Sequence, residues 1–423
     1  MQVPRLTGVH CVSLLAIPVS YLINSGFGLS EPFSIAVTGF AVLLALVAVT
    51  YLLVQTRLPQ DPLFYVFTVF SFTSVIDLII SLEEDGYLSG FMEFYMKEGE
   101  PYLRTAYGIM ICYWDGTVHY GFYLMMLSAI VERKDYRNVG LYWLGSLMMS
   151  MVVFLPSNMI GKFGSELRPA FLLNIPYLLL PVWAGLNIYK KPKTLPYCSV
   201  EKVVEEQQKW LHQRPLDLAF VVYLLFAVVF TLFRGLVVLD CPTSFCFNYL
   251  YQYEPYLKDP VAYPKVQMLV YLFYALPFFC LCIYGLIRPG CTWMPDWTLV
   301  FAGALAQAQF SHIGSSLHHR TPYTYRTPED AWWPFVSSNF LYALGLNFLA
   351  YRCLQNPSFF MVPNWMYKTK MTRSTNRPNG SELEAVKKVL SLSLVRWKMN
   401  FLMQSWCALS TLETVFCLDS KHQ

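Results

Sequence analysis

The chain has 423 residues, of which 55% are hydrophobic and only 14% are charged, and its formal net charge is +4. A soluble domain carries about 25% charged residues, so this composition excludes an ordinary globular protein and favours one that crosses a membrane several times. The small positive charge gives no indication of nucleic-acid binding, and we expect no nucleic-acid partner. The eleven cysteines form no CxxC pair and no Cys/His zinc pattern, and we expect no cofactor.

Apolar segments long enough to cross a bilayer recur along the chain. About 20 apolar residues of helix span the hydrocarbon core, whereas a spanning strand is much shorter. The first segment could instead be a signal peptide, but it lacks a convincing small-residue cleavage site, so we favour a retained helix. We predict an all-α polytopic membrane protein with about ten transmembrane helices, near residues 9–23, 33–54, 63–82, 105–131, 140–160, 170–189, 216–239, 266–288, 297–316 and 332–353.

The sequence repeats itself at an offset of 154 residues. Glu100-Pro101-Tyr102-Leu103 recurs as Glu254-Pro255-Tyr256-Leu257. A repeat built of apolar segments indicates a duplicated membrane bundle. Each copy has four predicted spans and returns the chain to its starting side, so the copies are parallel, which weighs against a transporter built from inverted repeats. The predicted parts are two leading helices at 1–60, a first four-helix domain at 61–190, a cytosolic linker at 191–215, a second four-helix domain at 216–353 and a cytosolic tail at 354–423.

The distribution of Lys and Arg orients the predicted bundle. With ten spans, basic residues gather on the side of the linker and of both termini, whereas acidic loops gather on the opposite side. An excess of Lys and Arg is typical of cytosolic loops, so we predict that both termini are cytosolic. Cys241 and Cys246 then share a lumenal loop, where they could form a disulfide. In the tail we predict a polar stretch at 362–384, whose Asn379-Gly380-Ser381 sequon should stay unmodified, and an amphipathic helix at 385–418.

Few ionisable groups stand inside the predicted spans, and each costs about 2.5–3.5 kcal/mol on insertion. Asp115 and His119 are four residues apart on one helix face and could form a proton-handling pair. The open alternative is a polar pair that only fixes helix packing. Asp77 is either a cavity-lining acid or a partner for Arg234 or Lys162. Arg234 lies less than two turns from Asp240, so we interpret it as a side chain that reaches the membrane surface.

The second copy lacks the pair, because Asp115 and His119 fall on Leu269 and Phe273 at the repeat offset. Any chemistry is therefore expected in the first copy. Three histidines of the second copy suggest a metal site, but no cysteine or carboxylate completes a ligand set, so we predict none. These histidines are His312, His318 and His319.

Five stretches closely resemble the transmembrane 6 superfamily. They are Phe91–Tyr95, Lys97–Thr105, Cys112–Tyr120, Phe233–Pro242 and Gln307–His312, and the resemblance covers about residues 8–357. That family belongs to the EXPERA superfamily, a four-helix membrane fold that includes the emopamil-binding sterol isomerase and the sigma-2 receptor, and members of this kind carry the domain twice. The resemblance implies residence in the endoplasmic reticulum and its intermediate compartment. It also implies a part in triglyceride loading of lipoproteins and in limiting lipid droplets, with membrane lipids, sterols and lipoprotein-assembly proteins as partners.

The resemblance to the sterol isomerase also implies site residues. That enzyme uses a His and a Glu in the second helix of its domain and a further Glu in the third. Asp77 aligns with the first Glu, but Thr73 stands where the His should be. We therefore expect a lipid-binding cavity without catalysis. The alternatives are a sterol delta8-delta7 isomerase acting through Asp77, Asp115 and His119, and a small-solute transporter. The cavity candidates are Thr73, Asp77, Tyr113, Asp115, His119, Asn174, Tyr177 and His312.

Glu166 is a loop residue with a separate prediction. It stands close to Lys162 and Arg168 in a short loop that the orientation places in the lumen. Glu166→Lys would leave three cations together beside the membrane, and we predict lower protein abundance rather than a catalytic defect. The alternative is a solvated charge worth less than about 1 kcal/mol.

Overall fold

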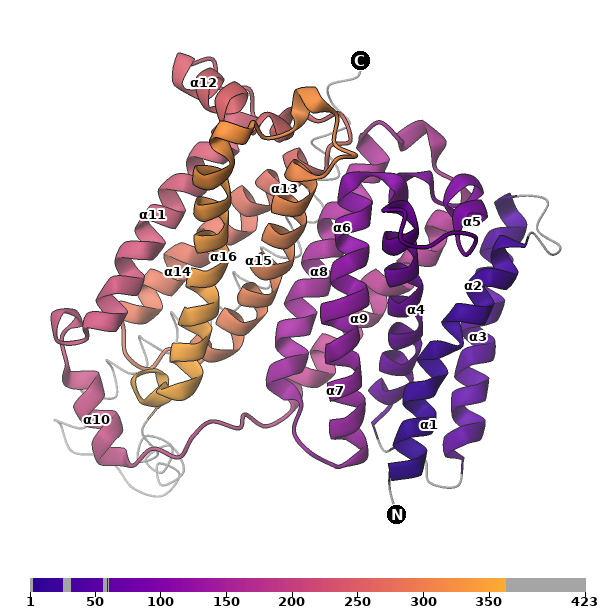
Figure 1. Ribbon diagram of the computed structural model, residues 1–423. Helices are drawn as coiled ribbons and strands as arrows, with labels where there is room; N and C mark the ends of the chain where they lie inside the picture. The colour runs from indigo at the N-terminus through magenta and orange to yellow at the C-terminus, as the bar shows by residue number, and fades with distance from the viewer. Residues whose placement is uncertain (1–2, 26–31, 56–58, 60, 363–423) are drawn as a thin grey trace. The chain divides into compact units, whose positions relative to one another are not determined.

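The computed structural model describes residues 3–25, 32–55, 59 and 61–362, and every regular element within these ranges is a helix (Figure 1). The all-α prediction is confirmed. Six helical segments of the described chain are long and apolar enough to cross a membrane, as a polytopic protein requires. They are Pro32–Val54, Leu63–Glu84, Arg137–Ile160, Pro169–Lys190, Pro215–Val238 and Tyr263–Ile287.

The remaining four predicted spans also form helices. They comprise α1 (Val3–Leu14) with α2 (Ala16–Asn24), α6 (Ala106–Trp114) with α7 (Tyr120–Val131), α15 (Met294–Leu317) and α16 (Trp332–Gln355). The predicted tail helix at 385–418 and the sequon at Asn379 lie outside the described residues. By its contacts the described chain has one main unit, formed by the residues up to 198 and by 206–361, and the contacts discussed below all lie within it.

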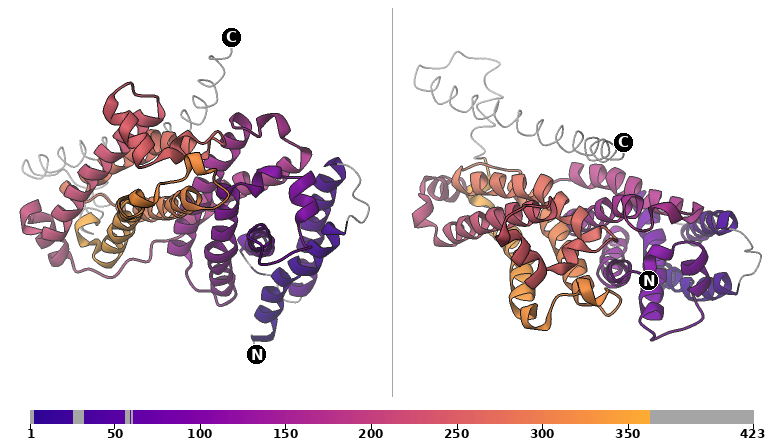
Figure 2. Two further views of the ribbon diagram at one scale, coloured as in Figure 1. Left: turned by 45° about the horizontal axis from the view of Figure 1, so that its top comes forward. Right: turned by 90° about the horizontal axis from the view of Figure 1, so that it is seen from above.

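The first copy is a helical bundle behind two leading segments. Helices α1 and α2 pack on α4, while α3 packs on α4 and on the start of the last helix, so the leading segments cover one side of the bundle (Figures 1 and 2). The elements are α3 (Pro32–Val54), α4 (Leu63–Glu84), α5 (Glu93–Glu98), η1 (Pro101–Arg104), α6, the π-helical turn η2 (Asp115–His119), α7, α8 (Arg137–Ile160), η3 (Gly164–Glu166), η4 (Pro169–Asn174) and α9 (Ile175–Lys190).

The second copy repeats this order of elements. After the linker, with α10 (Val200–Gln208) and η5 (Leu211–Gln213), come α11 (Pro215–Val238), α12 (Ser244–Gln252), η6 (Pro255–Lys258), α13 (Tyr263–Val270), the π-helical turn η7 (Tyr271–Ala275), α14 (Leu276–Ile287), α15, η8 (Tyr323–Tyr325), η9 (Glu329–Ala331), α16 and η10 (Pro357–Phe360). Even the π-helical turn recurs in the second spanning helix of each copy. The duplication read from the sequence thus extends to local geometry.

The repeated Glu-Pro-Tyr-Leu segments close the same end of each bundle, which we call the motif end. In each copy a short helix is followed by a 3-10 turn that begins at the proline of the motif. The hydroxyl of Tyr95 donates to Glu100 and that of Tyr249 donates to Glu254, both over 2.8 Å. Both glutamates are buried. Glu100 and Glu254 belong to the acidic loops of this side, and tyrosine donors five residues earlier allow each carboxyl group to turn inward.

Equivalent helices of the two copies, α8 and α15, pack closely against each other. A Cβ atom on Gly145 would lie 1.7 Å from the carbonyl oxygen of Val300, and one on Gly303 would lie 2.0 Å from that of Tyr142. Gly145 and Gly303 are 158 residues apart, as are Tyr142 and Val300, so the two contacts are reciprocal, as across a two-fold dimer interface. Small residues let membrane helices approach to this distance.

A buried ion pair adds to this interface at the other end of the bundles. Arg137 lies at the start of α8 and Asp296 in the first turn of α15, and their side chains are almost fully buried. The guanidinium contacts the carboxylate twice, from Nη1 to Oδ1 over 2.6 Å and from Nη2 to Oδ2 over 3.1 Å. Near the motif end, Tyr263 donates a hydrogen bond to Asn158 of α8. Polar contacts thus fix the interface on both sides of its glycines.

Candidate functional site: a carboxyl-lined cavity in the first copy

A cavity of about 150 Å³ lies inside the first copy, between the bundle and the leading helices. Most of its lining is apolar and comes from α2, α3, α4, α6, α8 and the last helix. Val42 of α3 and Val19 of α2 close its outer side, and a Cβ atom on Gly39 would lie 2.8 Å from the side chain of Leu173. Only 17% of the apolar window of α3 is buried, so one wall of the cavity is a helix that is otherwise mostly exposed.

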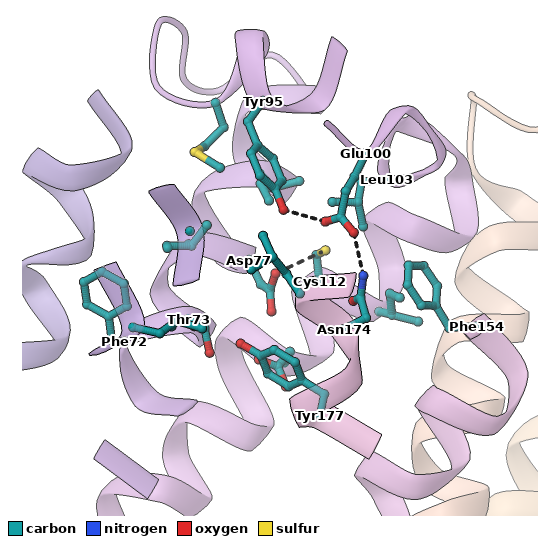
Figure 3. A pocket seen from close by; sticks show the side chains of 18 of the residues that line it. Phe72, Thr73, Asp77, Tyr95, Glu100, Leu103, Cys112, Phe154, Asn174 and Tyr177 are labelled. Atoms are coloured by element: carbon teal, nitrogen blue, oxygen red, sulfur yellow. Dashed lines mark hydrogen bonds between the residues drawn. The ribbon is translucent and has the colours of Figure 1, made fainter. Parts of the chain in front are cut away.

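Asp115 is the centre of a chain of hydrogen bonds on the cavity wall. Its Oδ1 lies 2.6 Å from Nδ1 of His119, and its Oδ2 accepts from the hydroxyl of Ser74 over 2.6 Å. Asp77 also lines the cavity, where its Oδ1 lies 3.7 Å from the thiol of Cys112, and Figure 3 shows Asp77 pointing into the cavity. The wall thus carries two carboxyl groups beside an imidazole, and a carboxyl group can donate a proton when it is neutral.

The other ring nitrogen of His119, Nε2, also has a hydrogen-bond partner. It lies 2.7 Å from the hydroxyl oxygen of Ser146, and that oxygen also accepts from the indole nitrogen of Trp114 over 2.8 Å. A neutral imidazole with its proton on Nδ1 satisfies every one of these contacts, because Nδ1 then donates to Asp115 and Nε2 accepts from Ser146. Asp115 and His119 are the first and last residues of the π-helical turn η2. Such turns are often found at functional sites.

Glu100 brings a third carboxyl group to the cavity from the motif end. It accepts hydrogen bonds from the hydroxyls of Tyr95 and Tyr102 and, over 2.5 Å, from the amide of Asn174 (Figure 3). Burial raises the pKa of Glu100 above its ordinary value, although these three hydrogen bonds lower it. The cavity therefore combines apolar walls with carboxyl groups at two places and has no lysine or arginine in its lining.

Most residues expected from the sequence meet in this cavity. Tyr113 does not, since its hydroxyl donates to Asp85 over 2.8 Å outside the cavity, and neither does His312, which belongs to the second copy. Sequence reasoning missed Glu100, Ser74, Ser146 and Tyr95; the repeated motif was the signal that could have indicated Glu100. The expected residues that line the cavity are Thr73, Asp77, Asp115, His119, Asn174 and Tyr177.

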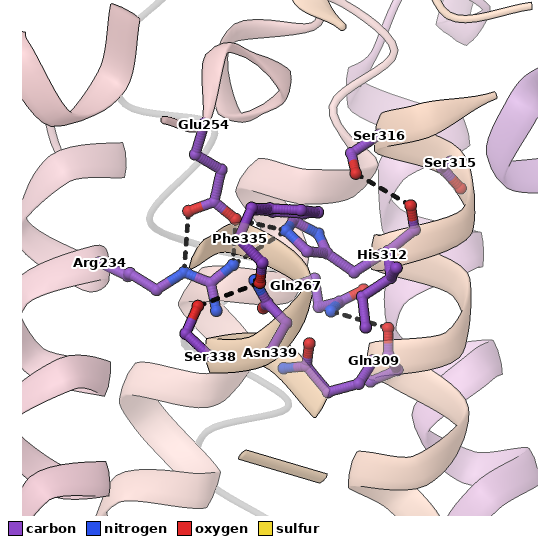
Figure 4. Close-up of polar contacts among 12 residues, drawn as sticks. Arg234, Glu254, Gln267, Gln309, His312, Ser315, Ser316, Phe335, Ser338 and Asn339 are labelled. Atoms are coloured by element: carbon purple, nitrogen blue, oxygen red, sulfur yellow. Dashed lines mark hydrogen bonds and ion pairs between the residues drawn. The ribbon is translucent and has the colours of Figure 1, made fainter. Parts of the chain in front are cut away.

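The second copy contains a different polar cluster, shown in Figure 4. Arg234 binds Glu254 through Nε and Nη2, and His312 Nε2 lies 2.5 Å from Glu254 Oε1. All three side chains are at most 1% exposed. The interpretation of Arg234 as a side chain that reaches the membrane surface was therefore wrong, because Glu254 supplies its countercharge inside the bundle. Although burial acts to raise it, the pKa of Glu254 is lowered to about 2 by the charge of Arg234 and the hydrogen bond with His312.

The remaining predicted residues lie in loops. Cys241 and Cys246 are separate thiols in the structure, and Cys241 Sγ contacts the hydroxyl of Thr243 over 3.3 Å. The disulfide suggested by the sequence stays a prediction. Glu166 is exposed in η3. Its neighbour Arg168 pairs with Glu98 over 3.1 Å. The predicted sensitivity of Glu166 stays a prediction.

Comparison with known proteins places the chain in a family. Residues 15–199 match the family model "Transmembrane 6 superfamily member 2-like, transmembrane domain", and residues 245–353 match "EXPERA (EXPanded EBP superfamily)". Transmembrane 6 superfamily member 2 of Homo sapiens is 60% identical over 364 residues, which are 86% of this chain and 97% of that protein. The chain belongs to the transmembrane 6 superfamily. The mouse and rat members 2 are each 59% identical over 362 residues, or 85% of this chain and 96% of theirs. No solved structure matches this superfamily member.

Proposed function

We propose that this member of the transmembrane 6 superfamily regulates lipid metabolism in the membranes of the endoplasmic reticulum and its intermediate compartment. In this role it promotes triglyceride loading and secretion of lipoproteins and limits lipid-droplet content, and it acts by binding a lipid or sterol in the cavity of the first copy. The cavity is the observation that carries the proposal. Apolar walls with a few convergent polar groups are typical of sites that bind small apolar molecules, and both occur here.

The size of the cavity restricts how such a ligand binds. Sites that enclose a drug-sized ligand measure about 300–1,000 Å³, about twice or more the 150 Å³ of this cavity. A sterol or glyceride therefore places one polar end near Asp115 or Glu100, and the rest of the molecule extends past α3 toward the bilayer. Helix α3 suits this role because only 17% of its apolar window is buried.

A cavity-filling substitution on α3 tests the proposal. Val42→Trp places an indole in the cavity, whereas Leu44→Trp is the matched control, because Leu44 on the same helix is 71% exposed. With a photoactivatable sterol in bilayer nanodiscs, we expect Val42→Trp to lower labelling about tenfold or more and Leu44→Trp to leave it unchanged. In hepatocytes the same variant should lower secreted triglyceride. Normal labelling and secretion by Val42→Trp would overturn the proposal.

A delta8-delta7 sterol isomerase is the second candidate, favoured by the presence of Asp77, Asp115 and His119 together on the cavity wall. Such a reaction protonates one side of a double bond and removes a proton elsewhere, and two carboxyl groups beside an imidazole can supply both groups. Purified protein is incubated with labelled delta-8 sterols. If the wild type turns over the sterol and both Asp77→Asn and Asp115→Asn abolish this turnover, the isomerase replaces the binding-only proposal. If the wild type binds the sterol without turnover, the binding-only proposal is supported.

The proposed orientation places both termini and the linker in the cytosol and the motif end in the lumen. A glycosylation sequon inserted after Asp240 tests it, because this position lies at the motif end, beyond the end of α11. We expect the inserted sequon to be glycosylated and an identical sequon inserted after Lys193, in the linker, to remain unmodified. The reverse pattern would invert the assignment.

A further inference from the structure

Three metal-ligating side chains from both copies meet at the motif end, away from the cavity. Asp85 directly follows α4 of the first copy, and His318 and His319 directly follow α15 of the second. One carboxylate oxygen and one nitrogen from each imidazole all lie within 4.8 Å of one another. His318 Nε2 lies 3.0 Å from Asp85 Oδ1, and the two imidazole rings are 4.3 Å apart. The carboxylate that the sequence did not supply comes from 233 residues away.

Neighbouring groups orient these side chains. The hydroxyl of Tyr113 donates to Asp85 Oδ2 over 2.8 Å, so Oδ1 remains turned toward the histidines. The guanidinium of the adjacent Arg320 pairs with Glu84, whose Oε2 lies 2.6 Å from Nη2. The side chains of His318 and Asp85 are 8% and 15% exposed, while His319 is exposed. The cluster is thus held in place on one side by the hydrogen bond of Tyr113 and open to water on the other, and such outer hydrogen bonds orient the ligands of metal sites.

We propose that Asp85, His318 and His319 bind one divalent transition-metal ion, with Zn²⁺ as the best match. Two imidazoles and one carboxylate are a known zinc ligand set, and water on the side of His319 would complete four-coordination. The ion would join the end of α4 to the end of α15 and so fasten the two copies at their motif ends. This site is independent of the lipid cavity and of the function proposed for it.

A backbone contact of His318 sets the expected strength of binding. The backbone N–H of Arg320 donates to Nδ1 over 3.1 Å, so without metal the proton is on Nε2 and points at Asp85. Metal at Nε2 moves this proton to Nδ1 and ends the contact with Arg320. The loss of one such hydrogen bond costs about tenfold in affinity, so we expect micromolar binding rather than nanomolar.

The test uses the full chain, purified in detergent through a tag without histidines and stripped of metal with a chelator. Zn²⁺ is titrated in competition with a chromophoric zinc indicator, and Co²⁺ is added separately to record its visible absorption. We expect one equivalent of micromolar Zn²⁺ and the absorption bands of four- or five-coordinate Co²⁺. His319→Ala should weaken binding at least tenfold, and the matched control His212→Ala, an exposed histidine in η5, should not change it.

A second readout separates binding from loss of fold. Zn²⁺ should raise the Tm of the wild type and of His212→Ala, but not that of His319→Ala. His319 is exposed, so its truncation should leave the metal-free Tm unchanged, and this variant decides the question even where Asp85→Asn fails to fold. The proposal is overturned by a wild type that binds no Zn²⁺ below about 100 μM, or by His319→Ala binding Zn²⁺ as tightly as the wild type.

Discussion

The ion pair inside the second copy gives a prediction whose magnitude follows from the structure. Arg234→Met removes the countercharge from Glu254, which is 0% exposed. Lowering the pKa of Glu254 from its ordinary 4.5 to about 2 corresponds to about 3 kcal/mol. Removing one partner of a buried pair typically costs about 3–5 kcal/mol. For a domain of the size of the second copy, a loss of this magnitude lowers the Tm by roughly 10 °C.

The partner variants determine whether the charge is the cause. In the double variant Arg234→Met with Glu254→Gln no buried charge is left alone, so we expect it to recover at least half of the lost stability. Arg104→Met is the matched control, because Arg104 pairs with Glu84 at a half-exposed site and Glu84 keeps Arg320 as a partner. We expect this control to cost less than about 1 kcal/mol. Thermal unfolding in detergent, followed by intrinsic fluorescence, measures all three.

The pH dependence of the same pair has a definite sign. The folded pKa of Glu254 is lowered to about 2, so its contribution is present above the unfolded value near 4.5 and is lost as the pH falls toward 2. In Arg234→Met the buried carboxyl group has lost its countercharge, so burial raises its pKa. The Tm difference from the wild type should therefore be largest near pH 8 and shrink as the pH falls and Glu254 of the variant takes up a proton. A single variant as stable as the wild type, or a double variant no better than the single one, would refute the reasoning.

Three further predictions concern other parts of the chain. Gly145→Leu should cost more than about 3 kcal/mol and lower the yield of folded protein in size-exclusion chromatography, because its Cβ would meet Val300, whereas Gly121→Ala, with open space around it, should cost nothing. Glu166→Lys should lower steady-state abundance in cells, and unchanged levels would contradict this. Asn174→Leu removes a hydrogen-bond donor from the buried Glu100. We expect it to cost about 1–3 kcal/mol of thermal stability and to leave the mRNA level unchanged.

The helices and the duplication could be predicted because both depend on local pattern. Apolar runs of about 20 residues fix the spans, and the i, i+4 spacing of Asp115 and His119 sufficed to bring them together. The pairing of His119 with Ser146 and of Asp115 with Ser74 depends on packing between helices, which no short pattern records.

The features that the sequence did not predict have a common physical cause. Glu100, Glu254 and Arg234 are charged, and hydropathy therefore assigns them to loops or membrane surfaces. Their partners make burial possible. Tyrosines and an amide bind Glu100 in the first copy, and a tyrosine, an arginine and a histidine bind Glu254 in the second. The same limit applies to Asp85 and His318, which are far apart in the chain and adjacent in space.

The reciprocal glycine contact between α8 and α15 has a consequence for biogenesis. Helix α8 ends at Ile160 and α15 at Leu317, so at about 5–20 residues per second the first copy waits roughly 10–30 s for its counterpart. During this interval the groove at Gly145 contacts lipid, and Arg137 has not yet met Asp296. A chaperone or degradation factor of the membrane could recognise the nascent chain at this stage. Substitutions that delay insertion of α15 would then lower abundance without weakening the finished protein.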